Sequence, residues 1–153
     1  MTTLHIGAAG ELLVQYHLLK NEVDSARLTT DSGIDLVAYS AGNEKARTIQ
    51  VKTVRVPGHA GGNKRAPLAI GLRFPETCPA ELIALALLST NEVWLFTTNQ
   101  ARKMAQQHSD SGFCQLYWYL DPETAPRGAR HQGDMDRYRL ENCFERHFPL
   151  PDN

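Results

Sequence analysis

The sequence has few cysteines and no long apolar run. Its three cysteines, Cys78, Cys114 and Cys143, are odd in number and far apart, which argues against a disulfide framework or a thiolate zinc site and fits a reducing compartment. The longest apolar run, residues 82–88, is far too short to span a bilayer. The N-terminus also lacks the basic and then apolar pattern of a signal peptide. We therefore expect a cytoplasmic protein without a membrane segment.

Several catalytic motifs are also absent. The six histidines show no paired ligand spacing, which argues against a histidine zinc site. No serine motif resembles a nucleophile elbow, and no Gly-rich loop matches a nucleotide-binding loop. These absences argue against zinc-dependent hydrolysis, serine esterase chemistry and nucleotide binding.

The chain as a whole lacks an excess of either charge, since its net charge is −1. The distribution is less even. Residues 45–75 contain seven basic residues and no acidic one, so the rest of the chain carries a net charge of −8. Such asymmetry fits a nucleic-acid contact surface. A solvated basic hairpin and loop would produce the same pattern, and charge alone does not separate the two.

The length of 153 residues suits one domain, residues 1–153, built around a single sheet. Leu4, Ala8, Leu12, Tyr16 and Leu19 recur at helical spacing and predict a helix from Thr2 or Thr3 to about Lys20. Gly7 and Gly10 are costly inside a helix, so we expect a close approach to another backbone near Glu11. Strands are expected over residues 23–28, 34–41, 44–54, 68–74, 82–88, 93–97 and 113–120, and helices over 99–108 and about 138–144. The expected fold class is α/β, a mixed central β-sheet with the Glu11 helix and a later helix packed against it.

A hairpin signal fixes the register of two of these strands. Gly42-Asn43 is a two-residue turn, and pairing outward from it keeps the position numbers of opposite residues summing to 85. Asp35 then lies opposite Gln50. Gln50 and Lys52 share a face because strand side chains alternate. Three polar side chains are therefore expected to converge on one patch.

The order of these residues resembles the PD-(D/E)XK nuclease superfamily, particularly Holliday-junction resolvases and related small endonucleases. The matching residues are Gly10-Glu11 on the helix, Gly33-Ile34-Asp35 on one strand and Gln50-Val51-Lys52 on the next, within residues 4–98. The resemblance implies a restriction-endonuclease-like core of α-β-β-β-α-β type and a metal-dependent endonuclease, a phosphodiester hydrolase. Two positions depart from the pattern. Ile34 replaces the proline. Gln50 replaces the usual acidic residue, and this change keeps an oxygen ligand but removes a negative charge.

The resemblance also implies roles for these residues around Mg²⁺ or Mn²⁺, which prefer oxygen ligands. Asp35 would be the central carboxylate ligand, and the Gln50 side-chain oxygen and the Val51 carbonyl would lie beside it. Glu11 would bind the ion directly, through water, or hold a second ion. Lys52 would orient or help deprotonate the attacking water.

The implied partner is DNA, with RNA as an alternative, and the family expectation is a homodimer. Four residues in or beside the basic loop 57–65 are candidates for phosphate contacts: Arg55, His59, Lys64 and Arg65. An exposed loop without a role is an equally good reading of these four. The main alternative function is that of a catalytically silent relative that binds nucleic acid or a protein partner.

Overall fold

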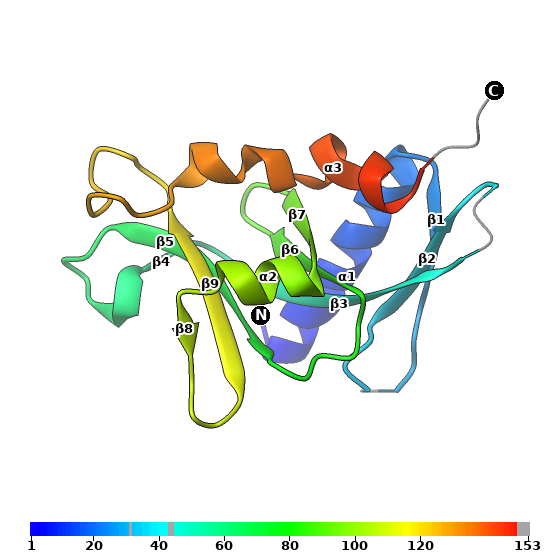
Figure 1. Ribbon diagram of the computed structural model, residues 1–153, viewed down its shortest axis with the longest axis horizontal. Coiled ribbons are helices and arrows are strands. Elements are labelled where there is room, and N and C mark those ends of the chain that lie inside the picture. The colour runs from blue at the N-terminus through cyan, green and yellow to red at the C-terminus, as the bar shows by residue number, and fades with distance from the viewer. Residues whose placement is uncertain (31, 43–44, 150–153) are drawn as a thin grey trace.

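A computed structural model describes residues 1–30, 32–42 and 45–149, which form two sheets and three α-helices (Figure 1). The elements in chain order are α1 (Thr3–Lys20), β1 (Val23–Arg27), β2 (Leu36–Ser40), β3 (Arg47–Val54), β4 (Gly58–His59), β5 (Leu68–Pro75), β6 (Leu82–Leu87), β7 (Glu92–Thr97), α2 (Thr98–Met104), β8 (Gln107–His108), β9 (Phe113–Tyr119) and α3 (Leu140–His147), with short 3-10 helices at Ala60–Gly62 and Gln132–Tyr138. None of the helices in these residues combines the length and the hydropathy that a membrane span requires.

The central sheet has the strand order β1-β2-β3-β6-β7, and the second sheet has the order β4-β5-β9-β8. Strands β3 and β6 are parallel, whereas the other neighbours in the central sheet are antiparallel. The predicted mixed central sheet is thus confirmed. The connection between the parallel strands is built from β4 and β5, where the expected core has a helix. The predicted strands over residues 68–74 and 113–120 form the second sheet.

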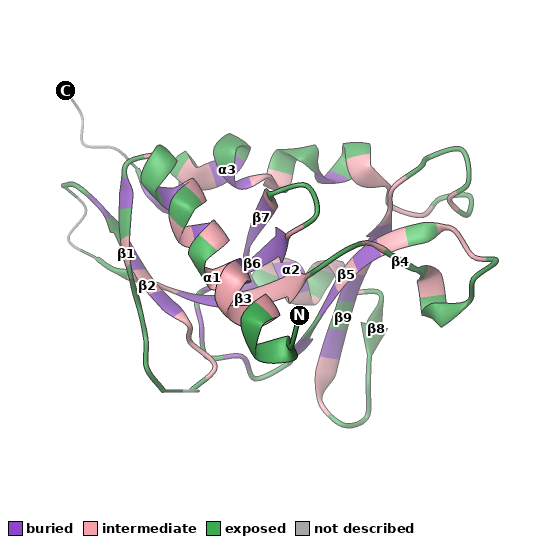
Figure 2. Ribbon diagram, turned by 180° about the vertical axis from the view of Figure 1, so that it is seen from behind, coloured by how far each residue is buried: buried purple, intermediate pink, exposed green. Residues whose placement is uncertain are grey.

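The two faces of the central sheet are covered by different layers. Helix α1 packs on one face through Val14 and Leu18, and α3 packs on the same side through Leu140. The second sheet covers the other face, where Ile70 and Trp118 belong to the same apolar cluster as Ile83, Trp94 and other residues of the central sheet. Strands β6 and β7 are therefore buried on both sides (Figure 2), which accounts for their continuous apolar sequences.

The predicted register between β2 and β3 is confirmed where the two strands pair. The observed pairs are Leu36 with Ile49, Val37 with Thr48 and Ala38 with Arg47, and their position numbers sum to 85. The ladder ends at Leu36, so Asp35 precedes the strand instead of forming part of it. The predicted turn at Gly42-Asn43 lies partly outside the described residues.

Helix α1 forms as predicted but turns a different face to the sheet. Thr2 caps it by accepting a hydrogen bond from the His5 N–H. The side buried against the sheet carries Gly10, Val14 and Leu18, whereas the stripe that predicted the helix is mostly exposed: Leu4 by 85%, Leu12 by 55%, Tyr16 by 57% and Leu19 by 58%.

A close backbone approach at Gly10 explains this orientation. A Cβ at Gly10 would lie 1.8 Å from Oγ1 of Thr53 on β3, so only glycine lets the helix approach the strand at this point. A Cβ at Gly7 would meet nothing within 4 Å. The expected close approach therefore occurs at Gly10 alone, and it is made to a side chain.

The predicted helix over residues 99–108 is too long at its C-terminal end. Helix α2 begins after a capping box between Thr97 and Gln100 and ends at Met104. The chain then joins the edge of β9, where the Gln106 side chain accepts a hydrogen bond from the Tyr117 N–H at 3.1 Å and donates one to the Tyr117 carbonyl at 2.6 Å. These bonds replace the helical ones and start β8. The predicted helix near residues 138–144 is observed as α3, displaced toward the C-terminus.

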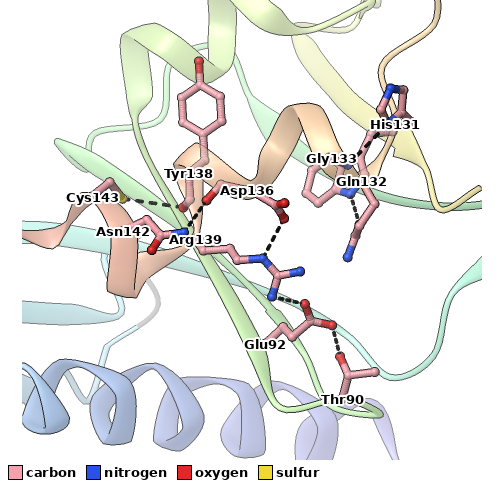
Figure 3. A network of polar contacts seen from close by, with 11 residues as sticks. Thr90, Glu92, His131, Gln132, Gly133, Asp136, Tyr138, Arg139, Asn142 and Cys143 are labelled. Carbon is pink, nitrogen blue, oxygen red and sulfur yellow. Dashed lines mark hydrogen bonds and ion pairs between the residues drawn. The ribbon is translucent and has the colours of Figure 1, made fainter. Parts of the chain in front are cut away.

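Arg139 ties the C-terminal segment to the central sheet (Figure 3). Its guanidinium contacts Glu92 at the start of β7 and lies 2.9 Å from Oδ1 of Asp136. Its carbon Cζ also lies 5.4 Å from the centre of the Trp94 ring. The segment between β9 and α3 is therefore fixed over the end of β7 by charge and by packing.

Candidate active site

Asp35 directly precedes the first residue of β2. Beyond this point β2 no longer pairs with β3, so the edge of β3 is open. The main-chain N–H of Asp35 donates to the Ile49 carbonyl at 2.9 Å, and its carbonyl accepts from the Leu28 N–H at 2.9 Å. Its side-chain Oδ2 accepts a hydrogen bond of 2.7 Å from the Val51 N–H. Three bonds thus fix this residue between β1 and β3. Its other carboxylate oxygen, Oδ1, accepts no hydrogen bond from the described residues.

The Val51 carbonyl faces the same open edge. Backbone groups of a strand point alternately to its two sides, and the Ile49 carbonyl already bonds Asp35 on this side. The N–H and the carbonyl of Val51, two residues on, therefore point toward Asp35 as well. Beyond Ile49, no partner strand covers this side of β3 in the described structure.

Gln50 and Lys52 leave β3 on the face opposite Ile49 and Val51, which pack on the α1 side. Gln50 is 8% exposed, and its Oε1 accepts a hydrogen bond from the Cys78 thiol at 3.0 Å. The neighbouring Pro79 packs near Gly33, where a Cβ would lie 3.1 Å from the proline Cδ. The loop before β6 therefore contacts both the Gln50 side chain and Gly33, in the segment that leads into Asp35.

Lys52 is half-buried two residues further along β3. Within the described residues, its ammonium group has no hydrogen-bond or ion-pair partner. A partly buried lysine without a structural partner is available for an anionic ligand.

Glu11 is bound to arginine instead of to the other three predicted residues. Its Oε2 accepts bonds from Nε and Nη2 of Arg27, both at 2.8 Å. Arg27 pairs with Leu36, the residue after Asp35, so the ion pair lies beside the same strand end, on the side of the sheet covered by α1. The side chains of Arg27 and Glu11 are 42% and 23% exposed, and an ion pair with this much solvent access contributes little to the free energy of folding. A cation can therefore displace the guanidinium at small cost.

The predicted phosphate-contact residues Arg55, His59, Lys64 and Arg65 are all exposed. The loop that carries the last three is closed by a bond from the Ala60 N–H to the Pro67 carbonyl at 3.0 Å. The His59 ring nitrogen Nδ1 lies 2.7 Å from the Ala66 carbonyl. This segment forms the short strand β4 and a 3-10 turn, so His59 lies on the second sheet and not at the β3 edge.

Sequence reasoning missed two residues of this region. Cys78 contacts Gln50 from a loop 28 positions away, and no spacing rule connects them. Arg27 reaches Glu11 because β1 pairs with β2, and the polar turn cluster at residues 29–33 is too long to fix the register of these strands.

The predicted ligands on or beside β3 offer three kinds of oxygen donor: the carboxylate of Asp35, the Val51 carbonyl and the Gln50 amide oxygen. Hard oxygen donors of this kind fit Mg²⁺ or Mn²⁺. A separate cluster of Glu76, His108 and Cys114 has ligand atoms within 4.8 Å of one another at one end of the second sheet. Burial first, and then the charge of Glu76, raise the pKa of the Cys114 thiol, which disfavours the thiolate that a metal needs.

Comparisons with known proteins identify the fold. No family model and no curated protein matches the sequence. Among solved structures, the bacterial homing endonuclease I-Ssp6803I superposes with a TM-score of 0.61 over 99% of this chain and 100% of its own, at 12% sequence identity. The Holliday junction resolvase Hjc from Archaeoglobus fulgidus superposes with a TM-score of 0.46 over 84% of this chain and 93% of its own, at 15% identity. The superposition on I-Ssp6803I shows that the chain has a restriction-endonuclease-like fold.

Proposed function

We propose that this chain is a metal-dependent endonuclease that hydrolyses DNA phosphodiester bonds at the open edge of β3. The observation that carries the proposal is the position of Asp35. Its carboxylate is fixed by the Val51 N–H at 2.7 Å, beside the two residues of β3 that the nuclease motif requires, and one of its oxygens remains free. Neither packing nor capping of a helix accounts for a carboxylate held in this way.

The proposed metal ligands are Asp35, the Val51 carbonyl and Gln50, with Glu11 joining from α1. A bound Mg²⁺ or Mn²⁺ would supply Lewis-acid stabilisation of the charge that develops on the phosphate. Asp35 provides the negative charge that attracts the ion, and the two neutral oxygens complete its side of the site. Because Gln50 contributes no charge, Glu11 matters more here than in a site with two acidic strand residues. For Glu11 to bind the ion, its ion pair with Arg27 must first break.

Lys52 is assigned to the attacking water and the phosphate. Its ammonium carries charge that lowers the cost of bringing a phosphodiester toward Asp35. In the reaction, the Lys52 ammonium would orient the attacking water by donating a hydrogen bond to its oxygen and would offset the charge on the phosphate, while the proton released by the water passes to solvent. The proposed specificity for DNA comes from the fold shared with a protein described as a homing endonuclease, and RNA is the alternative substrate.

We further propose that residues 1–153 act as a single domain and that two copies associate. Leu4, Leu12, Tyr16 and Leu19 form an exposed apolar stripe on α1, and an exposed apolar patch can mark a protein–protein contact surface. A second copy is the proposed occupant, because one compact site reaches one strand of a duplex. Sedimentation of the parent and of Leu12→Glu tests this. We expect the parent to sediment as a dimer and Leu12→Glu to sediment as a monomer.

A catalytically silent relative that binds nucleic acid or a protein is the second candidate. Two observations favour it, namely the neutral Gln50 at an acidic position and the occupation of Glu11 by Arg27. A silent protein would bind no divalent cation at Asp35, and replacement of Asp35 would leave nucleic-acid or partner binding intact.

The test of the proposed function is cleavage of supercoiled plasmid, single-stranded DNA, a four-way junction and RNA in Mg²⁺, Mn²⁺ or EDTA. Cleavage should require the metal and be lost in Lys52→Met, which preserves the length and apolar stem of the side chain. Lys103→Met, which alters an exposed lysine of α2, is the matched control and should cleave as the parent does. Absence of metal-dependent cleavage by the folded parent on every substrate would favour the silent relative.

A further inference from the structure

The second sheet has an inner face packed on the central sheet and an outer face open to solvent. Leu72, Leu116 and Trp118 point inward to the apolar core. The residues that alternate with them, such as Arg73, Gln115 and Tyr117, point outward. A groove of about 500 Å³ crosses this outer face and is lined by residues from all four strands. Its volume lies within the range of ligand sites in proteins.

Aromatic rings form a row along the outer face of β9. Phe113, Tyr117 and Tyr119 occupy alternating positions on this strand, with Gln115 between the first two. The rings of Tyr117 and Tyr119 lie 6.1 Å apart and nearly perpendicular to one another, at 83°. The guanidinium carbon of Arg73 lies 4.0 Å from the centre of the Phe113 ring. The row thus combines flat apolar surfaces with a stacked cation.

The strand opposite this row leaves space beside the tyrosines. Gly71 pairs directly with Tyr117, and Ala69 pairs with Tyr119. A Cβ at Gly71 would lie 2.8 Å from the Cβ of Tyr117, so a larger residue there would push against the aromatic strand. Glycine and alanine therefore lie across from the two tyrosines, and the groove runs over the half-buried backbone of Ala69 and Gly71 next to the rings.

The chemistry of the groove suits an anionic, aromatic ligand. Its lining includes Arg73 and His59, and among the described lining residues none is acidic. Gln107 and Gln115 pair across β8 and β9 and add amide groups that both donate and accept hydrogen bonds. Flat rings for stacking, an arginine for phosphate and amides for base edges are the features by which sheets bind single-stranded nucleic acid.

We infer that the outer face of the second sheet binds unpaired nucleotides, whose bases stack on Tyr117 and Tyr119 while Arg73 contacts the backbone phosphates. This deepens the proposed function and rests on it only for the identity of the polymer as DNA. A paired duplex hides the faces of its bases, so an aromatic platform requires a single-stranded stretch. The expected substrates therefore carry an unpaired segment, such as a flap, a gap or an open branch point.

The test measures binding of a short fluorescein-labelled single-stranded DNA, and of the matching duplex, by fluorescence anisotropy in EDTA. Tyr117→Leu/Tyr119→Leu should weaken single-strand binding by about tenfold or more, because each stacked base contributes measurably to affinity. Tyr117→Phe/Tyr119→Phe keeps the rings and should bind as the parent does. Tyr39→Leu, which alters a half-exposed tyrosine of the central sheet, is the control and should also bind normally.

A second substitution protects the test against misfolding of the double variant. Arg73→Ala should weaken single-strand binding severalfold and reduce its dependence on salt, because a phosphate contact is removed. Equal single-strand binding by the parent, the leucine double variant and Arg73→Ala would overturn the inference. Cleavage of plasmid DNA by the parent is measured in parallel. If the parent cleaves DNA but the tyrosine substitutions do not change single-strand binding, the proposed nuclease function is supported and this binding site is not. If binding depends on the tyrosines but the parent does not cleave, the binding site is supported and the nuclease function is not.

Discussion

The Cys78 thiol donates a hydrogen bond to Oε1 of Gln50 at 3.0 Å, from a loop that also packs Pro79 against Gly33. This contact orients the one strand residue of the motif that lacks a charge. A neutral amide attracts a cation less than a carboxylate does, so its position must be fixed by its surroundings. Cys78 supplies that constraint in the described structure.

Removal of this thiol should weaken metal binding without unfolding the chain. We expect Cys78→Ala to lower the affinity for Mn²⁺ by about tenfold, the usual order for the loss of a partner that orients a ligand. Cys78→Ser keeps a donor at nearly the same place and should restore most of the affinity. Calorimetric titration of the three proteins decides the matter. Identical affinities would show that Cys78 does not orient Gln50 for the metal.

The ion pair between Arg27 and Glu11 should act against metal binding. Arg27→Gln frees Glu11, so we expect severalfold tighter Mn²⁺ binding, while the free energy of unfolding changes by less than about 1 kcal/mol because the pair is exposed. Glu11→Gln should weaken binding. Arg127→Gln, at an exposed position in the turn after β9, controls for the loss of one positive charge. Weaker binding in Arg27→Gln would show that the arginine positions Glu11 instead of competing for it.

The two glycines of α1 should respond in opposite directions to alanine. Gly10→Ala places a Cβ against Thr53 and should destabilise the protein by roughly 1–3 kcal/mol, as overpacking does. Gly7→Ala meets no neighbour and should stabilise it by up to about 1 kcal/mol through helix propensity. Urea denaturation measures both. A neutral effect of Gly10→Ala would contradict the close packing of α1 on β3.

His147 should make the protein sensitive to acid. Burial, and then the charges of Arg47 and Arg146, lower the pKa of its imidazole to about 4. The unfolded chain binds this proton near pH 6.5. The stability from the neutral ring is therefore fully present above that pH and is lost as the pH falls toward 4. The loss is on the order of 3 kcal/mol.

The comparison that tests this pH effect is between the parent and His147→Gln. Urea denaturation of both between pH 7 and pH 4 should show a smaller loss of stability in the variant, since glutamine takes up no proton. Parallel pH profiles would place the acid sensitivity in the carboxylates of the chain instead.

The parts of the fold that the sequence predicted are those set by local rules. The register of β2 and β3 follows from alternation and a turn signal, and the observed pairs keep the predicted sum of 85. The second sheet was not foreseen as a separate layer, because strand patterns do not reveal which strands pair. The face of α1 was misjudged since its most hydrophobic stripe is exposed, whereas Gly10 decides the packing through an absent side chain.

The same distinction applies to the site. Gln50 and Lys52 lie on β3 and Asp35 directly precedes β2, so the predicted register alone was enough to propose them as a group. Cys78 and Arg27 arrive from elements whose positions depend on tertiary packing. The sequence therefore predicted the motif but not the neighbours that orient Gln50 and occupy Glu11.

The central claim is that Asp35 holds a divalent cation, and titration calorimetry with Mn²⁺ tests it most directly. The parent should bind the ion, and Asp35→Asn should lose at least about tenfold in affinity because the central carboxylate ligand is gone. Asp24→Asn, at an exposed position of β1, should bind as the parent does. Asp35→Asn with the affinity of the parent, or a folded parent that binds no ion, would contradict the account.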